Sequence, residues 1–244
     1  MFSDFFETVP NGNERYIDWI IEGLGWTIAL ALLAWVIAFA LGTIVGAART
    51  AEHKGIRLAA RAYVETFRNI PLIVQMFLWF FVLPELLPAS VGGAIKRMQP
   101  PWASFVPALI CLGTYTASRV AEQVRSGINA LPRGQLEAAL ALGLSRRVAY
   151  RAVVLPQALR IVIPTLTSEV MAIFKNTSVA LTIGLLELTA QARQISEFTF
   201  KTFEAFAAAT AIYLLIAFLA YRFMLWIEQR VHVPGFGAPR GAKA

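Results

Sequence analysis

The sequence is poor in charged residues, cysteine and histidine. Only 15% of its 244 residues are charged and 57% are hydrophobic, whereas a soluble globular protein usually has about 25% charged and about 45–50% apolar residues. Too few polar side chains are present to cover a soluble fold, so a lipid bilayer is the expected solvent. The single cysteine, Cys111, excludes an internal disulfide, and two histidines with one cysteine leave no zinc-type ligand cluster. We therefore expect no metal and no cofactor.

Five apolar stretches predict an all-α membrane protein with five transmembrane helices, because about 20 apolar residues cross the hydrocarbon as a helix. The acidic segment before the first stretch argues against a cleavable signal peptide. The fourth stretch contains charged residues and is interpreted as one long or interrupted span. The expected spans are 23–48, 70–83 with an amphipathic extension over 58–67, 102–124, 155–186 and 205–226.

Lysine and arginine gather in the loops after the first, third and fifth predicted spans. Loops rich in these residues face the cytoplasm. The pattern therefore predicts a periplasmic N-terminus and a cytoplasmic C-terminus. The net charge of +7 does not indicate nucleic-acid binding, because that function needs a basic face on a soluble scaffold, and here the charges lie between apolar runs.

The segment 134–156 predicts a helix, a turn and a second helix on the cytoplasmic side. Residues 136–142 are strong helix formers, Gly143 suits the left-handed residue after a helix end, and Ser145 is a good N-cap. The alanines leave a thin surface that could enter a groove on another protein. A plain hairpin on the membrane surface is the alternative. The residues assigned to such an interface are Glu137, Ala138, Ala139, Gly143, Ser145, Arg146 and Arg147.

This segment resembles the EAA loop of ABC importer permeases. Glu137-Ala138-Ala139, Gly143 and Leu155-Pro156 stand at the spacing of that motif, and Val153 stands where the usual pattern has Ile. Residues 65–75 and 175–178 are similar to the polar amino acid branch, also called the histidine permease family. More narrowly, residues 84–88, 116–125 and 228–235 are similar to one permease subunit of a glutamate/aspartate importer. The resemblance covers about residues 2–236.

The resemblance implies the type I ABC importer permease fold, in a single permease domain over 1–236. It also implies a cytoplasmic coupling loop over 125–155 and a C-terminal tail over 237–244. In such importers two permease subunits enclose the path, two ATP-binding subunits lie beneath, and a periplasmic amino acid binding protein delivers the substrate. We expect a heterodimer with a homologous permease, a homodimer being the alternative, in the bacterial inner membrane.

The function that the resemblance implies is import of acidic amino acids, with glutamine or asparagine as alternative substrates. The chain has no Gly-Lys dipeptide and hence no Walker A loop, so ATP is expected on a partner subunit. An intramembrane enzyme is a rival, but there is no His-Glu-x-x-His motif and no nucleophile beside a plausible base. A passive channel or exporter is the second rival, and the EAA loop argues against it.

Charged residues inside the predicted spans are candidates for substrate binding, because a charge in hydrocarbon is costly and usually faces a cavity. Arg119 could hold a substrate carboxylate through its fork of donors, and Glu122 lies near the same helix face. Many relatives in the polar amino acid branch have an aromatic residue at the position of Arg119. The alternatives are that Arg119 pairs with Glu122 or extends to the lipid headgroups.

A second candidate group surrounds Lys175. The side chains of Asn176, Thr177 and Ser178 compete with helical hydrogen bonds and favour a break. A broken helix can direct backbone donors and a lysine toward an anion. The alternatives are that Lys175 pairs with Glu169 or another charge of the bundle, and that the three polar side chains bond to the backbone.

Two further patterns concern helix geometry. Pro71 predicts a kink or a helix boundary. Beside it, we interpret Arg68 as an anchor at the membrane interface more readily than as a substrate ligand, and Gln75 as a weak cavity candidate. Gly42 and Gly46 have the Gly-x-x-x-Gly spacing, which predicts a close helix contact within the subunit or with a partner.

Overall fold

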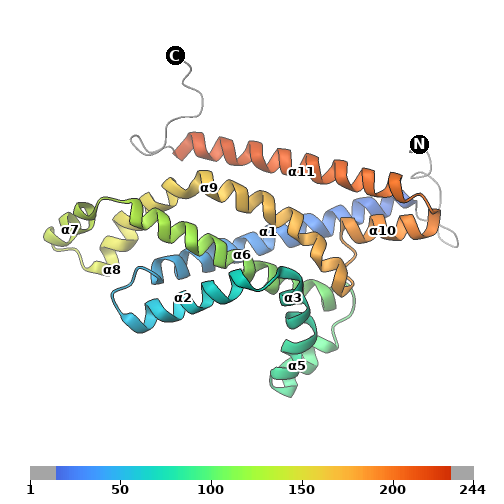
Figure 1. Cartoon of the computed structure of the whole chain (residues 1–244), viewed down its shortest axis with the longest axis horizontal. Helices are drawn as coiled ribbons and strands as arrows, with labels where there is room; N and C mark the ends of the chain where they lie inside the picture. The colour runs from blue at the N-terminus through green and yellow to red at the C-terminus, as the bar shows by residue number, and fades with distance from the viewer. Residues whose placement is uncertain (1–14, 232–244) are drawn as a thin grey trace, which may run out of the picture.

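The computed structural model describes residues 15–231, and every regular element in that range is helical (Figure 1). The elements in chain order are α1 (Tyr16–Ala48), α2 (Lys54–Asn69), α3 (Leu72–Phe77), the π-helix η2 (Leu78–Val82), α4 (Leu83–Leu86), α5 (Ala89–Lys96), α6 (Trp102–Ala130), α7 (Arg133–Ala141), α8 (Arg146–Ala149), the π-helix η3 (Tyr150–Val154), α9 (Leu155–Asn176), the 3-10 helix η4 (Thr177–Ile183), α10 (Leu188–Thr199) and α11 (Thr202–Val231).

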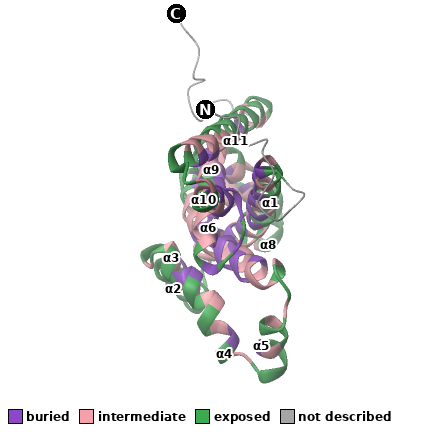
Figure 2. Ribbon diagram, turned by 90° about the vertical axis from the view of Figure 1, so that its right-hand side faces the viewer, coloured by how far each residue is buried: buried purple, intermediate pink, exposed green. Residues whose placement is uncertain are grey.

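The long helices α1, α6, α9 and α11 run along the longest axis of the molecule (Figure 1). Helices α7 and α8 lie at one end of this bundle, and α10 packs against α1 and α11 near the other end. Helix α2 runs beside α6, and the arm formed by α3 to α5 projects from the bundle (Figures 1 and 2). Burial is concentrated where α1, α6, α9 and α10 meet, whereas the arm is largely exposed (Figure 2).

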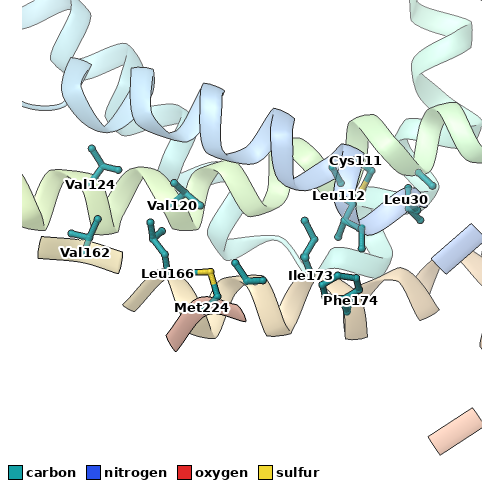
Figure 3. Packing of buried hydrophobic residues seen from close by; sticks show 14 of the residues in the cluster. Leu30, Cys111, Leu112, Val120, Val124, Val162, Leu166, Ile173, Phe174 and Met224 are labelled. Atoms are coloured by element: carbon teal, nitrogen blue, oxygen red, sulfur yellow. The ribbon is translucent and has the colours of Figure 1, made fainter. Parts of the chain in front are cut away.

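The core consists of apolar side chains between α1, α6 and α9, closed on one side by α11 (Figure 3). Small residues set the spacing of α1 and α6. A Cβ added at Gly42 would lie 2.7 Å from the Cβ of Val120, and one added at Gly46 would lie 2.7 Å from the carbonyl oxygen of Ala121. The predicted Gly-x-x-x-Gly contact is therefore confirmed, and it lies within the subunit.

Three helices are long and apolar enough to cross a membrane: Tyr16–Ala48, the continuous Arg146–Ile183 and Thr202–Val231. A fourth candidate is the pair Lys54–Asn69 and Leu72–Leu86, whose two halves are bent by 105°. Helix α6 has 29 residues but is not among these candidates, because Thr114, Thr116, Ser118 and Arg119 interrupt its apolar sequence. The structure thus supports three or four spans by length and composition, one or two fewer than the predicted five.

The break before α3 is at the predicted position. Helix α2 ends at Asn69, and Ile70 is extended with φ −89° and ψ 128°, as expected of a residue before proline. The buried side-chain amide of Gln75 donates to the carbonyl oxygens of Phe67 and Ile70, each at 2.8 Å. Gln75 therefore satisfies acceptors that the bend leaves open, which is a structural role and not the cavity role suggested by its position in the sequence.

Candidate functional site

The helix–turn–helix predicted for segment 134–156 is confirmed. Helix α7 spans Arg133–Ala141, Gly143 has the left-handed φ of 83°, and α8 begins at Arg146. Ser145 occupies the N-cap position, although its side chain makes no capping hydrogen bond. The chain then passes through the π-helix η3 directly into α9. The hairpin is therefore continuous with a long helix of the bundle.

The surface of this hairpin is more apolar than the sequence analysis recognised. Glu137, Ala138 and Arg147 are exposed as expected, whereas Ala139 is buried against the rest of the loop. Leu142 is 83% exposed at the turn. The further exposed apolar side chains of the hairpin are Leu140, Leu144 and Val148. Leucines at helical spacing resemble a core pattern, so the sequence offered no signal that they face outward.

Arg146 connects the hairpin to the loop between α1 and α2. Its Nη1 lies 2.7 Å from Oε1 of Glu52, and its guanidinium stacks over the ring of Tyr150 at 5.8 Å from the centroid. The hydroxyl of Tyr150 is 3.4 Å from that of Thr50. The hairpin therefore contacts both the loop before α2 and the bundle.

A polar cleft of about 360 Å³ opens between α1, α2 and α6. It contains the predicted pair Arg119 and Glu122 and two further arginines. Its lining residues are Arg49, Val64, Glu65, Arg68, Asn69, Arg119 and Glu122. Arg68, which the sequence analysis placed at the interface as an anchor, thus lies beside Arg119 in the same cleft.

Arg119 pairs with a residue of α9. Its Nε donates to Oε2 of Glu169 at 2.7 Å, and Gln123 Nε2 donates to the other carboxylate oxygen at 3.1 Å. The Glu169 side chain is 7% exposed and that of Arg119 is 42% exposed. Two alternatives from the sequence are therefore wrong: Arg119 does not pair with Glu122, and Lys175 does not pair with Glu169. The reason is that the buried carboxylate of Glu169 on α9 binds Arg119 on α6.

Glu122 is surrounded by three arginines, one at the end of α1, one on α2 and one on α6. Its Oε2 contacts Nη1 of Arg49, which caps α1, and lies 3.9 Å from Nη1 of Arg68 on α2. Its Oε1 lies 2.5 Å from Nη2 of Arg125, one turn further along α6. The carboxylate therefore orients three guanidinium groups that would otherwise repel one another.

Lys175 and its neighbours lie elsewhere. Helix α9 ends at Asn176 and continues directly as the 3-10 helix η4. The helical backbone is therefore continuous over Arg146–Ile183, and the predicted interruption is absent. The hydroxyl of the buried Thr177 donates to the carbonyl of Phe174, and that of Ser178 to the carbonyl of Lys175, each at 2.7 Å. The backbone alternative is thus correct for these two side chains.

Lys175 is exposed and belongs to a separate cleft of about 330 Å³ between η4, α10 and α11. Its lining residues are Lys175, Ser178, Thr189, Phe206, Ala209, Thr210 and Tyr213. Of the predicted substrate residues, Arg119 and Glu122 thus line one cleft and Lys175 and Ser178 the other, whereas Asn176 and Thr177 line neither. Among residues 15–231, no group of three His, Cys, Asp or Glu side chains is placed to hold a metal ion.

Comparison with known proteins gives a consistent family. Residues 38–233 match the family described as binding-protein-dependent transport system inner membrane component. The glutamate/aspartate import permease protein GltJ of Escherichia coli (strain K12) is 44% identical over 232 residues, covering 95% of this chain and 94% of GltJ. The nopaline transport system permease protein NocM of Agrobacterium fabrum is 34% identical, covering 92% and 94% of the two chains.

Solved structures agree with these relatives. An amino acid ABC transporter crystallised with histidines superposes with a TM-score of 0.74 at 31% identity, covering 88% of this chain and 95% of that chain. An inward-facing MetNI methionine ABC transporter gives a TM-score of 0.67 at 18% identity, covering 89% and 96%, which supports the fold. The resemblance indicated by the EAA loop and the all-helical type I importer fold are both confirmed. The chain therefore belongs to the family of inner membrane components of binding-protein-dependent transport systems, the permease subunits of ABC importers.

Proposed function

We propose that this permease imports acidic amino acids through a path that includes the cleft around Arg119. The similarity to GltJ supports this substrate class. The observation that carries the proposal is the cleft itself, in which three arginines, Arg49, Arg68 and Arg119, face two carboxylates. An excess of fixed cations favours an anionic substrate over a zwitterion without side-chain charge.

Within this cleft, Arg119 is the proposed carboxylate ligand. The contact with Glu169 uses Nε of the guanidinium, so the two terminal nitrogens can take a carboxylate in a bidentate geometry. Glu122 then acts on the orientation of Arg49 and Arg68. The second proposed location is the Lys175 cleft, where Lys175 would attract the anion and Asn176, Thr177 and Ser178 would shape the end of α9.

The coupling role is assigned to the hairpin of α7 and α8. We propose that Glu137, Ala138 and the exposed leucines dock on an ATP-binding subunit, with Gly143 and Ser145 shaping the turn and Arg146 and Arg147 supplying charge. This places the hairpin in the cytoplasm and the N-terminus in the periplasm, within one permease domain over 1–236 and a coupling loop over 125–155. The tail 237–244 lies outside the described residues. A homologous permease and a periplasmic amino acid binding protein complete the importer.

The test is uptake by the assembled importer in proteoliposomes. Arg119→Ala should lower aspartate and glutamate uptake by roughly 10- to 100-fold, because a hydrogen bond to a charged group contributes about 1.5–3 kcal/mol. Basal ATP hydrolysis should stay unchanged. Since Arg119→Ala leaves the buried Glu169 unpaired, the double variant Arg119→Ala/Glu169→Gln removes that charge and separates loss of substrate from loss of folding.

The matched control is Lys175→Gln, a neutralisation in the other cleft. If Lys175→Gln abolishes uptake while the Arg119 variants retain it, the substrate site lies at the end of α9. Unchanged uptake and affinity in the Arg119 variants would remove Arg119 from the proposal. Uptake should also require ATP, the ATPase and the binding protein together, whereas transport by the permease alone would favour a channel.

A further inference from the structure

Helix α2 carries a row of basic side chains that ends at Arg68 in the Arg119 cleft. Lys54, Arg57, Arg61 and Arg68 follow one another at spacings of three, four and seven residues, which places them on one face of the helix. All four are exposed. We call these four residues the basic stripe.

A neighbouring side of α2 lies against the bundle. Val64 is 1% exposed, α2 packs along α6, and the hydroxyl of Tyr63 donates to the carbonyl of Thr114 at 2.6 Å. These contacts fix which way the helix is rotated. The basic stripe flanks this buried side, and at its end Arg68 reaches α6, where its Nη1 lies 3.9 Å from Oε2 of Glu122.

Hydrocarbon is not a suitable environment for this face. The stripe extends over about 21 Å at 1.5 Å per residue, and α2 is one half of a bent candidate span. An arginine or lysine that faces the middle of a bilayer is energetically costly. Such a row is stable in a membrane where it borders water, so the stripe marks the wall of an aqueous space.

The two ends of the stripe lie at functionally distinct places. At one end, Arg68 lines the cleft that contains Arg119. At the other end, the loop that precedes Lys54 contacts the hairpin through the ion pair between Glu52 and Arg146 at 2.7 Å. The stripe therefore leads from the candidate substrate cleft toward the hairpin.

We propose that the basic stripe of α2 forms one wall of a water-filled vestibule that guides an anionic amino acid between the Arg119 cleft and the hairpin end of the permease. The nature of the anion rests on the proposed function. Two contacts hold the arginines along the helix: Arg61 Nε pairs with Glu65 at 2.6 Å and Arg57 Nη1 donates to the carbonyl of Ala51 at 3.1 Å. Glu65 also moderates the positive field, so that an anion is attracted without being retained.

The test places a reporter thiol on the stripe without removing a charge. Leu58 is 68% exposed and adjoins Arg57, so Leu58→Cys in a Cys111→Ala background costs little packing. The assembled importer in inside-out vesicles is treated with anionic, neutral and cationic methanethiosulfonates of similar size. The ratio of anionic to cationic labelling rates is then divided by the same ratio measured with a free thiol in solution.

We expect the neutral reagent to label Leu58→Cys, and the normalised ratio to exceed one by at least about threefold, because fixed cations concentrate anions locally. Adding Arg57→Gln and Arg61→Gln should return the ratio to about one. Leu215→Cys is the control, since Leu215 is 56% exposed in the middle of the apolar candidate span α11 and should stay unlabelled in lipid.

Two results would overturn the vestibule. If Leu58→Cys is as unreactive as Leu215→Cys, lipid or a partner chain covers the stripe. If it is labelled with a ratio near one, the space is aqueous but does not favour anions. Labelling needs no transported substrate, so an anion preference at Leu58→Cys without acidic amino acid uptake would contradict the proposed function alone.

Discussion

At the residue scale, the contact between α1 and α6 depends on the absence of side-chain atoms. Gly42 and Gly46 lie one turn apart and bring the backbone of α1 against Val120 and Ala121 of α6. Helices in lipid gain little from hydrophobic association, so close van der Waals packing of this kind carries more of the stability.

Gly46→Ala should therefore destabilise the permease. The added Cβ would lie 2.7 Å from the carbonyl oxygen of Ala121, which is backbone and cannot rotate away, and overpacking of this kind costs about 1–3 kcal/mol. Thermal unfolding in detergent measures the effect. The matched control is Gly25→Ala on the same helix, where nothing lies within 4 Å and the better helix propensity of alanine should leave stability equal or higher. Equal melting of both variants would show that α1 and α6 are further apart.

Glu187 offers a second prediction at this scale. It is fully buried and accepts hydrogen bonds from the backbone of Thr189 and Ala190, at 3.0 and 2.9 Å, and from the hydroxyl of Tyr213 at 2.7 Å. Burial raises the pKa of the Glu187 carboxyl, although these hydrogen bonds oppose the shift. The folded protein thus binds this proton at pH values where the unfolded chain has lost it.

The resulting contribution to stability is fully present below the unfolded pKa of about 4.3 and is lost as the pH rises through the folded pKa. Over that window the melting temperature of the native permease should fall with increasing pH more steeply than that of Glu187→Gln. The glutamine keeps an acceptor for the N-terminus of α10 but cannot ionise. Parallel pH profiles of the two proteins would show that Glu187 does not titrate there.

Residue-level prediction from the sequence succeeded where a short-range signal exists. The spacing of Gly42 and Gly46 indicates a contact by itself, and the hydroxyl groups of Thr177 and Ser178 bond to the backbone, as local competition for hydrogen bonds predicts. The partner of Arg119 has no such signal, because Glu169 is 50 residues away on another helix. Similarly, the position of Arg68 in the Arg119 cleft depends on the packing of α2 on α6.

At the element scale, the hairpin of α7 and α8 depends on one left-handed residue. Gly143 has a φ of 83°, and its amide donates to the carbonyl of Leu140 at 2.9 Å while that of Leu144 donates to the carbonyl of Ala139 at 3.2 Å. These bonds close the end of α7. The geometry of the turn decides how the exposed leucines are presented.

Gly143→Ala should weaken coupling more than folding. A side chain at this φ costs roughly 1–2 kcal/mol, and the strain is relieved by distorting the turn. We expect lower ATP hydrolysis stimulated by the binding protein, with the melting temperature of the bundle nearly unchanged. Gly134→Ala in helix α7 of the same hairpin is the control, since a Cβ added at Gly134 meets no atom within 4 Å. Full stimulation in Gly143→Ala would show that the turn geometry does not matter for coupling.

The hairpin and the α2 break were predictable as elements because each contains a residue with a restricted backbone. Gly143 ends a helix and Pro71 prevents one from continuing. The exposure of Leu142 was not predictable, because an apolar residue in a short helix is compatible with either a core or a docking surface.

At the scale of the whole molecule, length and hydropathy leave out the central helix α6 when candidate membrane spans are counted. Helix α6 lies in the centre of the bundle, where Cys111, Leu112 and Val120 are fully buried, and it therefore tolerates polar and charged side chains that a lipid-facing helix would exclude. Helix α11 is peripheral and exposes a continuous apolar surface. The two helices differ in sequence because α6 is packed inside the bundle whereas α11 lies at its edge.

The Arg146–Glu52 ion pair has a mechanical consequence. It joins two solvent-exposed side chains, 41% and 71% exposed, and so acts as a salt-sensitive tether beside the stiff connection of the hairpin to α9. High ionic strength screens such a pair, so motion of the hairpin would then be transmitted through α9 while the loop before α2 follows late or not at all. In the coupling role proposed for the hairpin, a movement started by the ATP-binding subunit would then reach α9 before it reaches the loop ahead of α2.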